Sequence, residues 1–178
     1  MAQAEFIEAK FIFKKNPDIS MNFISDGEGQ KLGFTKTDDG SNIIFTKDLE
    51  GIDVAIEHYP DGTKVFHMEK DSKGLPAMHE FKHDGTEFIY LFDAEKRLEK
   101  MVEMKTNGDK LTTWFSPRGE TITQEQRQQG GILFSMQNNL ERAMIWLKAD
   151  GSIEASGNEL LRAHIKLVFS KFLDGAEF

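Results

Sequence analysis

The composition of this 178-residue chain excludes several classes of protein. With 22 basic and 30 acidic residues its formal net charge is −8, and because neutralising phosphates requires clustered Lys and Arg, we expect no binding to nucleic acid. The absence of cysteine excludes disulfides, thiol catalysis and cysteine-ligated metals. No basic and then apolar leader opens the chain and no apolar run approaches the roughly 18 residues of a membrane span, so we expect a soluble protein without a membrane span, cytoplasmic or, if phage-encoded, part of a virion.

The first part of the chain predicts a hairpin. Residues 5–14 have the composition of a strand, the segment Asn16-Pro17-Asp18 ends it, and residues 19–25 supply its partner. We therefore assign residues 1–31 to an N-terminal hairpin within a single domain that spans residues 1–178.

The middle of the chain repeats one turn sequence every 22 or 23 residues: Asp39-Gly40, Asp61-Gly62, Asp84-Gly85 and Asn107-Gly108. Asp-Gly and Asn-Gly between alternating runs are strong hairpin signals. A second turn-like cluster, such as Ser116-Pro-Arg-Gly119, lies about halfway along each period, so one repeat contains two strands. Residues 32–155 are thus predicted to form hairpin repeats of a mainly β, antiparallel up-and-down meander, either an extended sheet or a barrel.

The segment from residue 121 to residue 149 fits two structures. Its apolar residues between 132 and 147 match a helical period, while the continued turn spacing at Gly130 and Asp150-Gly151 favours strands, which we prefer.

Residues 156–175 are predicted to form a helix. Ser156-x-x-Glu159 is a capping box, an apolar stripe follows, and Gly175 can end a C-terminal amphipathic helix. The stripe comprises Leu160, Leu161, Ile165, Val168, Phe169 and Phe172.

Treating each Asp-Gly pair as a two-residue turn predicts the register of the sheet and hence its two faces. One face is mostly apolar and is offered to the C-terminal helix. The other carries an apolar area that no segment of the chain covers, and an exposed area of this size usually marks an interface. We predict partner-binding, or self-association into a homo-oligomer, by its residues: Met68, Met78, Leu91, Met101, Trp114, Phe66 and Ile89.

Two sets of polar residues are candidates for chemistry. In the predicted register His67 lies opposite His79 with His58 diagonal to it, which could form a zinc site, but histidines on a half-buried sheet are more often hydrogen-bonded packing residues. Glu57, Glu80 and Glu103 recur every 23 residues. Carboxylates on alternate strands lie roughly 10 Å apart, too far for most glycosidase pairs, so we interpret this row as a solvated edge.

The turn sequences Tyr59-Pro-Asp-Gly-Thr63 and His83-Asp-Gly-Thr86 resemble those of MORN-type and YD-type repeat proteins. The resemblance covers residues 32–119. It implies a long antiparallel sheet that acts as a scaffold or binding surface. The Gly-x-Gly and Tyr-x-Gly-x-Trp elements of MORN repeats are missing.

No phosphate loop, nucleophile elbow or calcium loop occurs in the sequence. We therefore expect a non-enzymatic structural or protein-binding module without a cofactor, such as a cellular scaffold or phage structural component. A β-barrel that binds a small apolar ligand is the alternative, and an enzyme that uses the histidines is the least favoured hypothesis.

Overall fold

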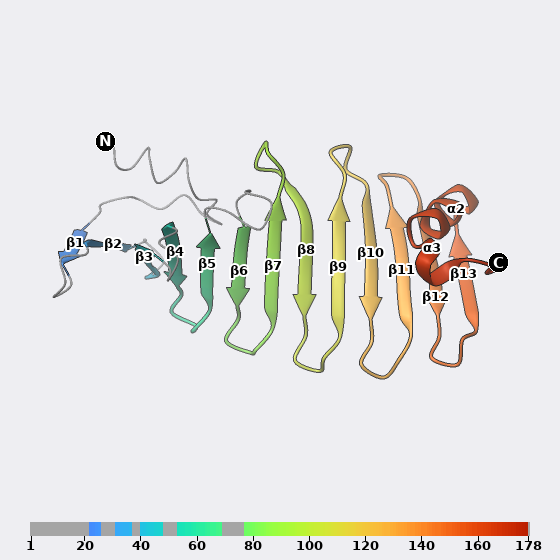
Figure 1. Ribbon diagram of the computed structural model, residues 1–178, viewed down its shortest axis with the longest axis horizontal. Helices are drawn as coiled ribbons and strands as arrows, with labels where there is room; N and C mark the ends of the chain where they lie inside the picture. The colour runs from blue at the N-terminus through green and yellow to red at the C-terminus, as the bar shows by residue number, and fades with distance from the viewer. Residues whose placement is uncertain (1–21, 26–30, 37–39, 48–52, 69–76, 178) are drawn as a thin grey trace. The chain divides into compact units, whose positions relative to one another are not determined.

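The computed structural model describes residues 22–25, 31–36, 40–47, 53–68 and 77–177, and it confirms a mainly β, antiparallel meander (Figure 1). Thirteen strands are found among these residues, and their order in the sheet is their order in the sequence, so the meander is open and not the alternative closed barrel. The strands are β1 (Asn22–Ser25), β2 (Lys31–Lys36), β3 (Asn42–Lys47), β4 (Asp53–His58), β5 (Lys64–Met68), β6 (Ala77–Phe81), β7 (Glu87–Phe92), β8 (Leu98–Met104), β9 (Lys110–Phe115), β10 (Thr121–Gln126), β11 (Ile132–Gln137), β12 (Arg142–Leu147) and β13 (Ile153–Gly157).

The chain divides into two compact units, Met1–Leu98 and Glu99–Phe178. The second unit contains residues 121–149, which form the strands β10, β11 and β12 that the turn spacing favoured. The predicted strand at residues 5–14 lies outside the described residues, and of the predicted strand at 19–25 the described part is β1.

The Asp-Gly and Asn-Gly hairpin turns contain one residue more than predicted. In the turn after β4, the N–H of Tyr59 donates to the carbonyl of Thr63 (2.9 Å) and the N–H of Gly62 donates to the carbonyl of Tyr59 (3.0 Å). A two-residue type I′ turn would require positive φ at both Asp61 and Gly62. Gly62 has φ +91°, but the φ of Asp61 is not positive. The turn is therefore the three-residue kind in which a type I turn is followed by a left-handed glycine.

The longer turn shifts the predicted register by one residue. Ala55 lies opposite His67, where the two-residue turn predicted Met68, and the same shift occurs around Gly85 and Gly108. Side chains alternate between the two faces of a sheet. A shift of one residue in the pairing therefore moves every side chain of a strand to the opposite face, relative to the side chains of the adjacent strand. The predicted faces are accordingly wrong.

The core of the second unit lies between its sheet and two short helices, α2 (Glu159–Val168) and α3 (Ser170–Leu173). The helices cover the β11–β13 part of this sheet (Figure 1). The buried residues of this core are Phe134, Met136, Ala143, Ile145, Ile165, Phe169 and Leu173. The expected C-terminal helix is thus confirmed in position, and it covers the sheet with Ile165 and Phe169 of its predicted stripe.

The helix begins two residues later than the capping box at Ser156 indicated. Ser156 belongs to β13, and the N-cap is Asn158, whose side-chain oxygen accepts the N–H of Leu161 at 3.0 Å. Gly157 has φ +88°, and its Cα lies so close to β12 that an added Cβ would be 2.2 Å from the carbonyl oxygen of Arg142. The chain therefore turns from strand to helix at a glycine, which displaces the cap from Ser156 to Asn158.

In the first unit, one face of strands β3 to β7 is buried. Ile43, Ala55 and Val65 are fully buried on it, and Val65, Met78 and Phe92 form a hydrophobic cluster. The same face carries buried polar residues, which are described below. In the described residues, no helix has the length and apolar character needed to cross a membrane.

Candidate functional site

The predicted partner-binding residues do not form one surface. Residues directly opposite each other in neighbouring strands share a face, and the observed pairs place Met68, Leu91, Phe66 and Ile89 on one face of the first unit but Met78 on the other, where it is buried. In the second unit Trp114 lies opposite Lys100, so the adjacent residue Met101 is on the other face. The one-residue shift in register places these residues on different faces, so the predicted Met/Leu/Trp row is wrong.

The three candidate histidines are also separated. His67 lies opposite Met78, not His79, while His79 lies opposite Phe66 and His58 opposite Lys64. His67 is therefore on the face opposite to His58 and His79, so the predicted cluster does not form. Among the described residues, no group of three or more His, Asp or Glu side chains is arranged to hold a metal ion.

Glu57 and Glu80 are buried, so the solvated edge predicted for the glutamate row is wrong. Each is 2% exposed. Glu57 Oε2 lies 2.8 Å from Nε2 of the buried His67, and the hydroxyl of Tyr90 donates to Oε1 of Glu80 at 3.2 Å. Buried carboxyl groups require such partners, because their transfer from water is otherwise costly. These polar contacts tie adjacent strands together within an otherwise apolar face.

In the second unit, the face of the sheet opposite to the helices is largely polar. Its central row runs across five strands as Thr113, Thr123, Ser135, Met144 and Ser156. The hydroxyls of Thr123 and Ser135 are hydrogen-bonded to each other. The Trp146 ring on this face is flanked by Arg127 and Lys148, at 5.4 and 5.0 Å from its centroid. This face of the second unit is therefore mainly polar, apart from Met144 and Trp146.

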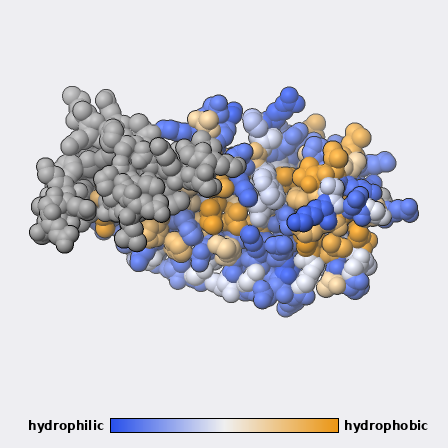
Figure 2. All heavy atoms as spheres, in the orientation of Figure 1, coloured by the Kyte–Doolittle hydropathy of each residue, from blue (hydrophilic) through white to orange (hydrophobic). Residues whose placement is uncertain are grey.

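Apart from Leu140 in the β11–β12 turn, the exposed large apolar residues of the second unit lie on the helices. Leu160 is 80% exposed and Leu167 is 75% exposed, and seven residues separate them, so they lie on one side of α2. Val168 and Phe172 are partly exposed beside them. In Figure 2 apolar side chains gather, in orange, where α2 and α3 lie in Figure 1. We refer to Leu160, Ala163 and Leu167 as the outward face of α2.

Sequence reasoning assigned Leu160 to the buried stripe and omitted Leu167. The signal was present, because at 100° per residue Leu160 and Leu167 lie well over 90° away from Ile165 around the helix. A single apolar stripe was assumed, whereas α2 has one that packs on the sheet and one that faces outward.

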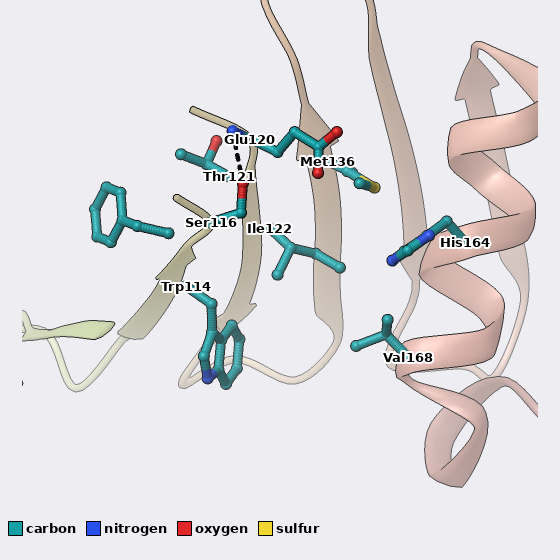
Figure 3. Close-up of a pocket in the computed structure, with 9 residues that line it drawn as sticks. Trp114, Ser116, Glu120, Thr121, Ile122, Met136, His164 and Val168 are labelled. Atoms are coloured by element: carbon teal, nitrogen blue, oxygen red, sulfur yellow. Dashed lines mark hydrogen bonds between the residues drawn. The ribbon is translucent and has the colours of Figure 1, made fainter. Parts of the chain in front are cut away.

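A pocket of about 170 Å³ lies between α2 and the ends of β9, β10 and β11. Its wall is apolar, and a carboxylate, a hydroxyl and an imidazole complete its lining (Figure 3). The lining residues are Trp114, Phe115, Ser116, Glu120, Thr121, Ile122, Met136, His164 and Val168. Of these, the sequence singled out Trp114 as a binding residue, although on a different predicted surface.

The polar residues of the pocket come from two elements. Ser116 and Glu120 flank the turn between β9 and β10, where Ser116 Oγ accepts the backbone N–H of Glu120 at 3.1 Å. His164 projects from α2 toward the sheet, and the Glu120 side chain lies on the opposite side of the pocket (Figure 3). On the neighbouring strand, Lys100 Nζ lies 5.5 Å from the centroid of the Trp114 ring. The pocket thus combines an apolar wall with one formal negative charge at its rim.

The aspartates of the turns have a structural role. Asp61, Asp84 and Asp150 each accept the backbone N–H of the residue two positions later, at 2.8 to 2.9 Å, and these hydrogen bonds lower the pKa of each carboxyl group. For Asp150 the largest cause of the lowered pKa is the hydroxyl of Ser152. Turn formation accounts for these carboxylates, which are exposed.

Comparison with known proteins identifies no relative: no protein-family model matches the chain, and neither does any curated protein sequence.

Proposed function

We propose that the protein is a non-enzymatic structural module that associates with a second copy of itself through the outward face of α2. The observation that carries this proposal is the pair of leucines on that face, which are 80% and 75% exposed although α2 already packs its other side on the sheet. Scattered apolar residues are normal on a protein surface, but large ones aligned on one helical stripe are typical of an interface.

The sequence of α2 favours a second copy as the partner. Ala163 lies between the two leucines, and a small residue there allows two helices to approach closely. The acidic Glu159 is in the first turn of α2, and the basic Lys166 is in its last turn. An antiparallel pair of identical helices therefore places unlike charges beside each other at both ends, as an isologous two-fold interface requires.

Light scattering coupled to size-exclusion chromatography tests the proposal on the full chain. We expect an oligomer for the parent protein and a monomer for L160E/L167E, because two carboxylates cannot be buried between the helices without partners. The matched control is L140E, since Leu140 is 92% exposed but lies in the turn between β11 and β12. This control should keep the parent mass.

Far-UV circular dichroism of all three proteins establishes that the substitutions leave the fold intact. A parent protein that is monomeric at every concentration up to its solubility limit would overturn self-association. So would an oligomer whose mass is the same in L160E/L167E as in the parent, because the interface would then lie elsewhere.

A further inference from the structure

We infer that the pocket between α2 and the β9–β10 turn binds a small organic amine that carries an aromatic or branched aliphatic group. The size of the pocket indicates the apolar part of this ligand. Cavities that hold drug-sized molecules are usually larger, roughly 300 to 1,000 Å³, whereas a cavity of about 150 Å³ is sufficient for benzene. At about 170 Å³, the pocket fits one ring or one leucine-sized group.

The wall of the pocket favours an apolar group. Trp114, Ile122, Met136 and Val168 line it, and they belong to four different elements, so the floor is set by the packing of α2 on the sheet. Trp114 also contacts the core through Phe169, with 5.8 Å between the ring centroids. A ring that enters the pocket can therefore lie against an indole and a thioether, both of which interact well with aromatic groups.

The rim of the pocket favours a positive charge on the ligand. Glu120 carries the formal negative charge of the lining, while Ser116 supplies a hydroxyl oxygen that accepts a hydrogen bond from an ammonium group. Glu120 is partly buried, and an ion pair is stronger there than at a fully exposed surface. Lys100, which lies beside the Trp114 ring, carries a positive charge that would favour an anionic ligand instead. The test therefore includes an anionic compound.

Titration with three compounds of matched shape tests the inference. Phenethylamine, 2-phenylethanol and phenylacetate present the same ring with a positive, neutral or negative head. In a W146F background Trp114 is the only tryptophan, so its fluorescence reports the pocket directly. We expect a saturable change with phenethylamine at roughly millimolar concentration. We expect weaker binding of 2-phenylethanol and no saturation with phenylacetate.

Variants of the lining separate the contributions of charge and shape. E120Q should weaken phenethylamine binding about 5-fold or more and leave 2-phenylethanol unchanged, while H164Q should preserve the preference for the amine. I122W should fill the pocket and abolish saturation by all three compounds. Binding of phenylacetate as tightly as phenethylamine, or an unchanged titration in I122W, would overturn the inference.

This site is independent of the proposed self-association. Leu160 and Leu167 do not line the pocket, so L160E/L167E should bind phenethylamine with the affinity of the parent protein. Loss of saturation in that monomeric variant would contradict the inference. If the parent protein is monomeric and still binds phenethylamine, the inference about the pocket is supported and only the proposed self-association is refuted.

Discussion

Nε2 of His67 lies 2.8 Å from Oε2 of Glu57 across the β4–β5 pair, and the two side chains are 1% and 3% exposed. Removal of one partner leaves the other polar group buried without this contact, and such a loss costs about 1 to 3 kcal/mol, more when the group is charged. We therefore predict that E57A lowers the free energy of unfolding by about 2 to 3 kcal/mol. Urea denaturation followed by circular dichroism measures this change.

The double variant E57M/H67F serves as the control for that prediction. Because both polar groups are replaced by apolar ones of similar size, it should cost less than E57A alone. If the loss of stability in E57M/H67F equals the sum of the losses in E57M and H67F, the Glu57–His67 contact contributes nothing to stability.

The repeated turns allowed the meander to be predicted from the sequence, but the faces of its sheet depend on a detail that the turns leave open. Asp61-Gly62 is compatible with a two-residue and a three-residue turn, and only the backbone of Asp61 distinguishes them. The two turns differ by one residue in register, so Glu57 was expected on a solvated edge and is found buried beside His67. The repeated turn sequence therefore predicts the order of the strands correctly but assigns residues such as Glu57 to the wrong face of the sheet.

The pocket and the outward face of α2 were harder to predict. The pocket depends on how α2 is placed over β9, β10 and β11, and the sequence of Trp114, Ile122 and Val168 holds no information about that placement. The position of α2 is determined in turn by Gly157, which turns the chain, and by the Asn158 cap. The turn at Gly157 and the cap at Asn158 could not be predicted once Ser156 had been assigned as the N-cap.

The two apolar sides of α2 should differ sharply in their effect on stability. Ile165 is fully buried in the core, whereas Leu167 on the same helix is 75% exposed. We predict that I165A costs about 2 to 4 kcal/mol, because it removes buried apolar contacts and leaves a cavity. L167A should change the free energy of unfolding by no more than about 0.5 kcal/mol when both substitutions are measured in an L160E background, which places a carboxylate in the proposed interface. Equal costs in urea denaturation would contradict the assignment of the two sides.

Gly157 and Gly151 form a matched pair with similar backbone conformation, φ +88° and +84°. An added Cβ at Gly151 meets no atom within 4 Å, so G151A should cost only the strain of a left-handed alanine, about 1 to 2 kcal/mol. At Gly157 the Cβ would be 2.2 Å from Arg142 O and 2.7 Å from Ala143 Cα, both in β12. We predict a clearly larger loss for G157A.

The loss in G157A should include part of the helix signal, because the N–H of Asn158 donates to that same Arg142 carbonyl at 3.1 Å. Displacing β12 therefore moves the N-cap of α2. Circular dichroism at 222 nm before denaturation checks this point. A G157A protein with the helical signal and midpoint of G151A would show that the strand can shift without disturbing the helix.

The turn aspartates predict how stability depends on pH. Hydrogen bonds to the folded turns hold the pKa of Asp61, Asp84 and Asp150 below the value of about 3.9 in an unfolded chain. At low pH the unfolded state thus binds more protons than the folded state, so this stabilisation is present above pH 4 and is lost as the pH falls through the folded pKa. We predict that the urea midpoint falls as the pH is lowered below about 4.

Asn107 shows how to isolate this effect, because its Oδ1 accepts the N–H of Asp109 at 2.9 Å in the equivalent turn without a titratable group. The variant D61N/D84N/D150N should retain the turns and show a shallower acid-induced loss than the parent. The converse substitution N107D adds a carboxylate at an equivalent position and should steepen the loss. Parallel midpoint-against-pH curves for the parent and both variants would mean that these turns do not couple protonation to folding.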